Sequence, residues 1–89
     1  MGNPRVISFV ARGRRRLEIL KLLIDHGRSQ VELMRLTKMY KTHTSRTLKE
    51  LLEKKLIVCK NPEDRMYKFY KITKKGKEFL EEAKRLIER

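Results

Sequence analysis

The sequence predicts a mainly α-helical domain with a small β-hairpin and an added C-terminal helix. Three observations carry this prediction: leucine-rich segments with helical spacing, a β-branched and an alternating aromatic segment on either side of a turn, and a clean apolar stripe near the C-terminus. A chain of 89 residues is long enough for one domain. We therefore expect a single unit over residues 1–89, with a thin core that oligomerisation would support.

The chain is expected to begin with two helical elements. Residues 1–12 are expected to form an N-terminal arm or a short helix, because Pro4 suits a first helical position. The segment RRRLEILKLLIDHG, residues 14–27, has leucines and isoleucines on one helical face. Gly27 stands where a left-handed C-terminal cap of this helix belongs.

Two further helices are expected before the hairpin. Ser29 and Glu32 match the capping-box pattern, in which each side chain satisfies the other's free backbone N–H, so a short helix is predicted to run to about Lys38. After a turn, a third helix is expected to begin with Tyr40 or Thr42 near its cap. Its apolar face is formed by residues at spacings of three and four, namely Thr44, Leu48, Leu51 and Leu52.

The last part of the chain predicts two strands and a helix. LIVCK, residues 56–60, is typical of a strand, NPED, residues 61–64, of a turn, and MYKFYKIT, residues 66–73, of a returning strand. Thr73 is expected to cap a final helix over residues 74–89. Three helices, a two-stranded hairpin and a C-terminal helix follow the winged helix-turn-helix plan.

The formal net charge of +13 predicts a polyanionic partner. Nucleic acid and an anionic membrane surface are the two candidates. No apolar run approaches the roughly 18 residues of a transmembrane helix, and the N-terminus lacks the apolar core of a signal peptide. A lone cysteine, Cys59, gives no disulfide framework, so an intracellular, reducing location fits. With nucleic acid as the partner, we expect a cytoplasmic, nucleoid-associated protein.

Three stretches carry a resemblance to a known family: ISFVARGRRRLEILKLL, VELMRLTKMYKTHTSRTLKELLEKKLIV and YKITKKGKEFL. They are similar to archaeal winged helix-turn-helix transcriptional regulators related to the MarR and ArsR groups, from Ile7 to about Leu80. The resemblance implies that the middle stretch holds the second helix, the recognition helix and the first wing strand. Lys38 and Lys55 replace glycines that are common in the family, so the helix ends can differ there, because a left-handed backbone is unfavourable for other residues.

The third helix is the candidate DNA-reading element. A major groove about 12 Å wide admits one α-helix. The helix is anchored by its leucines, so its polar face and N-terminal turn are expected to contact DNA through Lys41, Thr42, His43, Arg46, Thr47 and Lys49. The resemblance implies that Thr42, His43, Arg46 and Thr47 touch DNA, and the two-pronged donors of Arg46 suit guanine. The alternative is that these residues form a merely solvated helix face.

The wing supplies a further candidate, Arg65. The resemblance implies that it enters the minor groove or binds a phosphate. The alternative is a plain surface turn, because Glu63 and Asp64 beside it would repel phosphate.

A dense basic cluster at the start of the first long helix is another candidate. Arg14 and Arg15 are expected to contact the DNA backbone, which positions a protein without specifying sequence. A solvated face is the alternative. For the adjacent Arg16, the resemblance also implies a structural ion pair.

Two apolar segments lack an obvious partner in so small a body. These are Phe9 and Val10 near the N-terminus and a C-terminal stripe formed by Phe79, Leu80, Ala83, Leu86 and Ile87. Packing both between two copies would give a two-fold homodimer, whose recognition helices would meet half-sites about 34 Å, or a multiple of it, apart. The alternative is that both segments fold onto their own domain.

Other classes of function have little support. No Gly-rich phosphate loop, nucleophile elbow or apolar pair of carboxylates indicates an enzyme. His26, His43 and Cys59 do not form a ligand cluster, so no metal or cofactor is expected, and no small-molecule ligand is evident. The leading prediction is a homodimeric, sequence-specific transcriptional regulator that binds double-stranded DNA. An architectural DNA-binding protein and a protein–protein assembly module are the alternatives, and the sequence does not indicate the operator, an effector or the sign of regulation.

Overall fold

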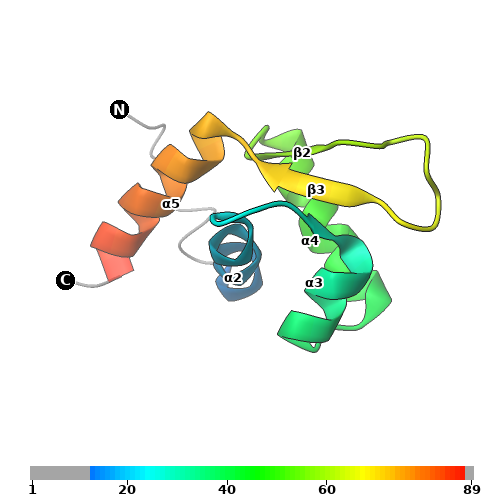
Figure 1. The fold of residues 1–89 in the computed structure, drawn as a ribbon. Coiled ribbons are helices and arrows are strands. Elements are labelled where there is room, and N and C mark those ends of the chain that lie inside the picture. The colour runs from blue at the N-terminus through cyan, green and yellow to red at the C-terminus, as the bar shows by residue number, and fades with distance from the viewer. Residues whose placement is uncertain (1–12, 88–89) are drawn as a thin grey trace.

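The computed structural model describes residues 13–87 and confirms the fold class expected from the sequence. In this part of the chain, four helices and a small three-stranded antiparallel sheet form a winged helix (Figure 1). The expected N-terminal arm, with Phe9 and Val10, lies outside the described residues, as do the side chains of Leu86 and Ile87. The elements follow in the order α2 (Arg14–Leu23), β1 (Arg28–Ser29), α3 (Gln30–Thr37), α4 (Lys41–Glu53), β2 (Ile57–Cys59), β3 (Phe69–Ile72) and α5 (Lys74–Ile87).

Helix α2 lies at the centre of the core, between α5 on one side and α3 on the other (Figure 1). Its buried apolar residues are Ile19, Leu20 and Leu23. Helical spacing predicted Leu20 and Leu23 on this face, whereas Ile24, predicted beside them, is 37% exposed. These side chains join one cluster with leucines from α3 and α4. Each buried leucine contributes roughly 1.5–3 kcal/mol of burial free energy, which offsets part of the conformational entropy lost on folding.

The sheet has one strand more than the expected hairpin. Strand β3 is central, with β2 on one side and β1 on the other, so the order is β1-β3-β2. Ile57 lies opposite Ile72 in the hairpin, and Arg28 lies opposite Tyr70 on the far side of β3. The prediction of a two-stranded sheet was therefore incomplete, because two residues are too few to show any alternating pattern.

The predicted helix starts are mostly confirmed. The N–H of Glu32 donates to Oγ of Ser29 at 3.1 Å, which caps α3. The reciprocal half of the capping box does not form, because the Glu32 carboxylate accepts instead from Nη1 of Arg28 at 2.7 Å. At the start of α5, the N–H of Gly76 donates to Oγ1 of Thr73 at 3.0 Å, as expected of a capping threonine.

The end of α2 differs from the expectation. The helix ends at Leu23, and Gly27 is not a left-handed cap, because no described glycine has a positive φ. A Cβ on residue 27 would collide with the ring of Phe69 in β3. The glycine is therefore needed where the backbone before β1 passes closely over β3.

The two lysines that replace family glycines keep the left-handed turn. Lys38 has a φ of 58° and Lys55 a φ of 61°, so the expectation that the helix ends can differ at these positions is wrong. After α4, the N–H of Leu56 donates to the carbonyl of Leu51 and that of Lys55 to the carbonyl of Leu52, at 3.0 and 2.9 Å. This pair of bonds is a Schellman motif, and it holds a lysine in a conformation that usually favours glycine.

Replacing Lys55 with glycine is therefore expected to stabilise the protein. A left-handed L-residue costs about 1–2 kcal/mol, and the extra freedom of glycine in the unfolded chain offsets roughly 0.5–1 kcal/mol of that gain. We expect urea denaturation to show a rise of about 0.5–1 kcal/mol in the free energy of unfolding. The control is Glu53→Gly, at the last residue of α4, where glycine should destabilise. A Lys55→Gly protein no more stable than the original would contradict the prediction.

Candidate nucleic-acid interface

Helix α4 has a buried face and a cationic outer face. Thr44, Leu48 and Leu51 face the core, as their spacing predicted. The side chains on the other face and at the N-terminal turn are exposed: Lys41, Thr42, His43, Ser45, Arg46 and Lys49. The N-cap residue is Tyr40, whose side chain makes no capping bond. Free backbone N–H groups and the helix dipole therefore add to the positive potential at this end of α4.

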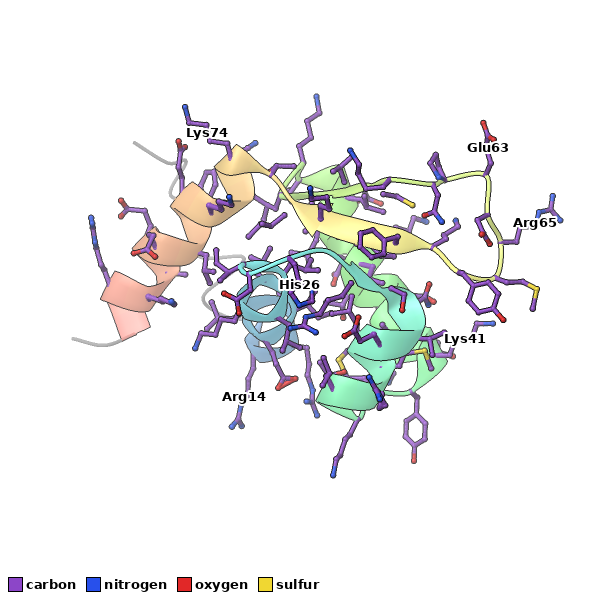
Figure 2. All side chains as sticks on the ribbon, in the orientation of Figure 1. Arg14, His26, Lys41, Glu63, Arg65 and Lys74 are labelled. Atoms are coloured by element: carbon purple, nitrogen blue, oxygen red, sulfur yellow. The ribbon has the colours of Figure 1, made fainter. Side chains whose placement is uncertain are left out.

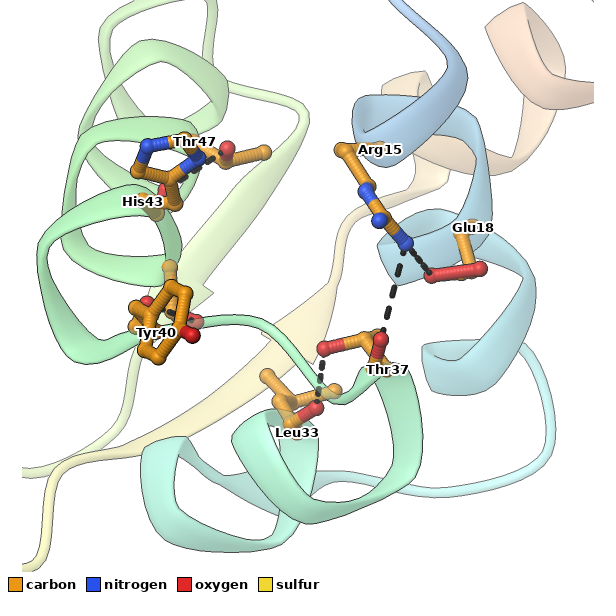
Figure 3. Close-up of polar contacts among 8 residues, drawn as sticks. Arg15, Glu18, Leu33, Thr37, Tyr40, His43 and Thr47 are labelled. Atoms are coloured by element: carbon orange, nitrogen blue, oxygen red, sulfur yellow. Dashed lines mark hydrogen bonds and ion pairs between the residues drawn. The ribbon is translucent and has the colours of Figure 1, made fainter.

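Thr47 does not lie on the outer face where the sequence analysis placed it. Its side chain is 7% exposed, and its Oγ1 donates to the carbonyl oxygen of His43 at 2.9 Å (Figure 3). The reason is positional, because Thr47 lies three residues after the buried Thr44 and four before the buried Leu51. The assignment of Thr47 to the DNA-contacting face is therefore wrong for this structure.

The arginines at the start of α2 have three different environments. Arg14 is exposed and points away from the body (Figure 2). Nη1 of Arg15 lies 3.2 Å from Oε1 of Glu18 and 3.5 Å from the carbonyl oxygen of Thr37 at the end of α3 (Figure 3).

Arg16 forms a structural ion pair, which the resemblance implied as an alternative to a contact with the DNA backbone. Its Nη2 lies 2.9 Å from Oε2 of Glu50, and both side chains are half-buried. The pair joins α2 to α4, so Arg16 helps to hold α4 in position against the body of the domain.

The wing, which consists of β2, β3 and the loop of residues 60–68, is ordered by two short polar side chains. Asn61 accepts from the N–H of Phe69 at 2.7 Å and donates to the carbonyl of Tyr67 at 2.8 Å. Oδ1 of Asp64 accepts from the N–H groups of Tyr67 and Met66, at 2.8 and 2.9 Å. These amides hold the pKa of Asp64 below its usual value and partly compensate its charge.

Arg65 projects from the tip of this ordered loop (Figure 2). Glu63 beside it also points outward (Figure 2), so one of the two carboxylates expected to repel phosphate remains free to do so. The other, Asp64, is directed at the loop's own backbone.

A groove of about 370 Å³ separates α4 from the wing. We call it the helix–wing groove, and its floor includes Leu52 and Tyr70. Its polar lining is Gln30, Lys41, Ser45, Lys49, Arg65 and Lys68. Burial raises the pKa of the Tyr70 hydroxyl, so this group stays neutral and adds no negative charge to the groove.

The groove brings together three of the predicted site residues, Lys41, Lys49 and Arg65, whereas Arg14 and Arg15 belong to α2. Three polar residues of the groove were missed. Ser45 had a detectable signal, because it lies four residues from both Lys41 and Lys49 on α4. Gln30 and Lys68 had none, because only the tertiary fold brings α3 and the wing beside α4.

The expected dimer stripe on α5 is largely buried within its own domain. Phe79, Leu80 and Ala83 belong to the core cluster, and α5 packs on α2. The assignment of these three residues to a dimer surface is therefore wrong, and the alternative of folding onto their own domain holds for them. The remaining members of both segments lie outside the described side chains.

The described residues give no support to two further classes of site. No group of three His, Cys, Asp or Glu side chains in this region is placed to hold a metal ion. None of its helices is both long enough and apolar enough to cross a membrane.

Comparison with known proteins places this geometry in a family. The family model described as winged helix-turn-helix matches residues 15–89. The fold is similar to that of the transcriptional regulator BldR from Sulfolobus solfataricus, with a TM-score of 0.74 and 25% identity over 83% of this chain and 54% of that one. Reduced HlyU from Vibrio cholerae matches with a TM-score of 0.73 and 26% identity, over 92% of this chain and 86% of that one.

A cysteine-to-serine mutant of MarR from E. coli, complexed with operator DNA, has the same fold with a TM-score of 0.73 and 20% identity, over 91% of this chain and 59% of that one. This chain thus spans little more than half the length of the BldR and MarR chains. Comparison with curated proteins found no match. Because the family model covers most of the sequence, the protein belongs to the winged helix-turn-helix family, and it has the fold of known transcriptional regulators.

Proposed function

We propose that the protein is a sequence-specific transcriptional regulator that binds double-stranded DNA as a homodimer. Helix α4 enters the major groove, and the wing contacts the adjacent backbone or minor groove. The observation that carries the proposal is the cationic outer face of α4, fixed to the core by Leu48 and Leu51 on its opposite face. The net charge of +13 favours a polyanionic partner over a protein–protein assembly role.

In this proposal the exposed residues of α4 have different roles in DNA recognition. Arg46 reads guanine through its two-pronged donors, and Thr42 and His43 contact base edges near the helix N-terminus. Lys41 and Lys49 contact phosphates, as does Arg65 from the wing. In this proposal the backbone contact from α2 is made by Arg14, with a weaker contribution from Arg15, whose guanidinium is shared with Glu18 and Thr37.

A homodimer would place two such units on a near-palindromic site, with half-sites about 34 Å, or a multiple of it, apart. The interface would use the segments that contain Phe9, Val10, Leu86 and Ile87. Residues 1–89 would then act as one DNA-binding domain in the cytoplasm, associated with the nucleoid. The archaeal part of the resemblance stays a prediction, because structures similar to a like degree come from Sulfolobus solfataricus and from Vibrio cholerae.

The test begins with a selection of genomic fragments that the purified protein retains, followed by titration of a retained duplex and a random duplex. A specific regulator keeps its site under excess competitor DNA, whereas an architectural protein is displaced. A protein that binds no duplex at low salt would overturn the proposal.

Arg46→Ala is expected to lower sequence discrimination. Loss of a bidentate base contact should weaken binding to the selected site by about 1–3 kcal/mol and binding to random DNA much less. Arg14→Ala removes the same charge from a backbone contact and should weaken both duplexes alike. The measurement that tests this prediction is the dissociation constant of each variant for each of the two duplexes. Equal losses on both duplexes for Arg46→Ala would refute its base-reading role.

A further inference from the structure

The side of the wing sheet that faces away from the core carries exposed apolar side chains. Alternation along the strands directs Ile57 and Tyr70 inward, where both are buried. Val58 on β2 and Phe69 and Lys71 on β3 therefore lie on the opposite side, and all three are exposed. An antiparallel sheet commonly leaves one face in water, but that face is then polar. The apolar groups on this side therefore indicate a binding surface.

The strand register arranges these side chains as a checkerboard. Val58 lies opposite Lys71. One pair closer to the wing tip, the N–H of Lys60 donates to the carbonyl oxygen of Phe69 at 2.8 Å, so Lys60 and Phe69 are opposite one another. Val58 and Phe69 are thus diagonal neighbours, and a lysine lies across from each of them. We call Val58, Lys60, Phe69 and Lys71 the outer wing face.

A hollow of about 260 Å³ adjoins the outer wing face at the root of the wing. The two share Lys71, and the apolar lining of the hollow includes the exposed Ile24 at the end of α2. The ring of Phe69 and the side chain of Lys71 both pack against Gly27, which also lines the hollow. The apolar surface therefore extends from the wing to the end of α2.

The lysines around this surface have no acidic partner in the described part of the chain. Lys60, Lys71 and Lys77, which lines the hollow, form no ion pair with any residue from 13 to 87. Asp25 is the one carboxylate in the lining of the hollow, and it pairs with neither of the lysines there. The surface thus combines apolar groups with a net positive charge, which favours an acidic and partly apolar occupant.

Three other occupants fit this surface less well than an acidic protein segment does. A second copy of the chain would bring the same lysines face to face, and like charges repel. Residues 1–12 include two arginines and no acidic side chain, so they would be repelled as well. A nucleic-acid strand would place phosphates near Asp25, and the aliphatic Val58 and Ile24 give its bases no ring for stacking.

We propose that the outer wing face and the adjoining hollow dock an acidic amphipathic helix of a partner protein. The apolar stripe of that helix packs on Val58 and Phe69, and its carboxylates pair with the three lysines around them. A helix laid on the uncovered side of the sheet completes a second layer, which is the usual way for a sheet to bury apolar groups.

The docking surface lies on the opposite side of β3 from the residues that face α4. Lys68 and Tyr70 line the helix–wing groove together with α4, whereas Phe69 and Lys71 alternate with them. A partner can therefore bind while α4 contacts DNA, so this inference goes beyond the proposed function and does not depend on it.

The first test uses a synthetic peptide, the striped peptide, in which leucines recur at helical spacing among glutamates. It carries a fluorescent dye, and its binding to the full chain is followed by anisotropy. A control peptide has the same composition in an order that forms no apolar stripe. The striped peptide should bind about tenfold more tightly, because only it buries its leucines on Val58 and Phe69. Equal affinity for the two peptides would indicate mere charge attraction and overturn the proposal.

The second test compares matched substitutions. Val58→Ser should weaken binding of the striped peptide by about tenfold. Val31→Ser is its control, because Val31 is 56% exposed against 43% for Val58 but lies on α3, and it should leave the affinity unchanged. Lys71→Glu should weaken binding by about fivefold, whereas Lys49→Glu on α4 should not. Urea denaturation checks that each variant is folded. Equal affinities of the two valine variants, or of the two lysine variants, would overturn the proposal.

Further measurements on Val58→Ser distinguish the other occupants. Its affinity for duplex DNA should equal that of the original protein, and a loss there would assign the surface to DNA. Weaker binding to a thymidine oligonucleotide or to phosphatidylserine vesicles, or dissociation of a homodimer, with peptide binding unchanged, would assign it to that occupant instead. A protein that binds no duplex but binds the striped peptide through Val58 would overturn the proposed function and leave this inference intact.

Discussion

Leu48→Ala is expected to lower the free energy of unfolding by about 2–5 kcal/mol, the range for a buried leucine that leaves a cavity. The side chain is 1% exposed and lies on the inner face of α4, within the core cluster. Marginal stabilities of about 0.05–0.15 kcal/mol per residue give a domain of this size only about 4–13 kcal/mol in total. Urea denaturation monitored by circular dichroism should therefore show a large drop in the midpoint concentration.

The same substitution has a functional consequence under the proposed function. Leu48 anchors the helix that carries Arg46, so duplex affinity should fall in step with the folded fraction, and excess DNA should restore part of the stability. Leu36→Ala is the matched control, because Leu36 is 45% exposed on α3 and its loss creates no enclosed cavity. Equal destabilisation by the two substitutions would contradict the burial of the inner face of α4.

Gly76→Ala is expected to destabilise the protein by about 1–3 kcal/mol, the usual cost of overpacking. Helix propensity alone predicts the opposite sign, because alanine is better than glycine in a helix by about 1 kcal/mol. The structure reverses the sign because a Cβ at residue 76 would collide with the carbonyl oxygen of Leu56. That oxygen accepts from the N–H of Thr73 at 3.0 Å, and the Thr73 hydroxyl is shared between it, at 3.0 Å, and the carbonyl oxygen of Lys55, at 2.8 Å. The oxygen therefore cannot retreat without breaking its bond to the Thr73 N–H.

Thermal and urea denaturation of Gly76→Ala measure the effect. Glu78→Ala, at an exposed position of the same helix, should change stability by no more than about 0.5 kcal/mol. A Gly76→Ala protein as stable as the original would show that α5 does not pack so closely against the turn after α4.

Much of the fold was readable from local pattern, because local physics decides it. Leucine spacing identified the buried faces of α2 and α4, and the hydroxyls of Ser29 and Thr73 marked the starts of α3 and α5. β-Branched and aromatic residues on either side of Pro62 identified the wing. Thr47 was misplaced although its signal was present, since its spacing to Thr44 and Leu51 already assigned it to the inner face.

By itself, the sequence determined most of the helical faces, the N-caps of α3 and α5, the wing strands and the charge of the outer face of α4, because each depends on neighbours three or four residues away or on composition. Only the tertiary structure decided the contacts between segments distant in the chain. These are β1 beside β3, the burial of Phe79, Leu80 and Ala83 as α5 packs on α2, and Gln30 bridging the wing and α4. Contacts between segments far apart in the chain leave no periodic pattern in the sequence. An amphipathic helix can therefore bury its apolar stripe in its own domain or against a partner, and only the geometry of the whole domain decides between the two.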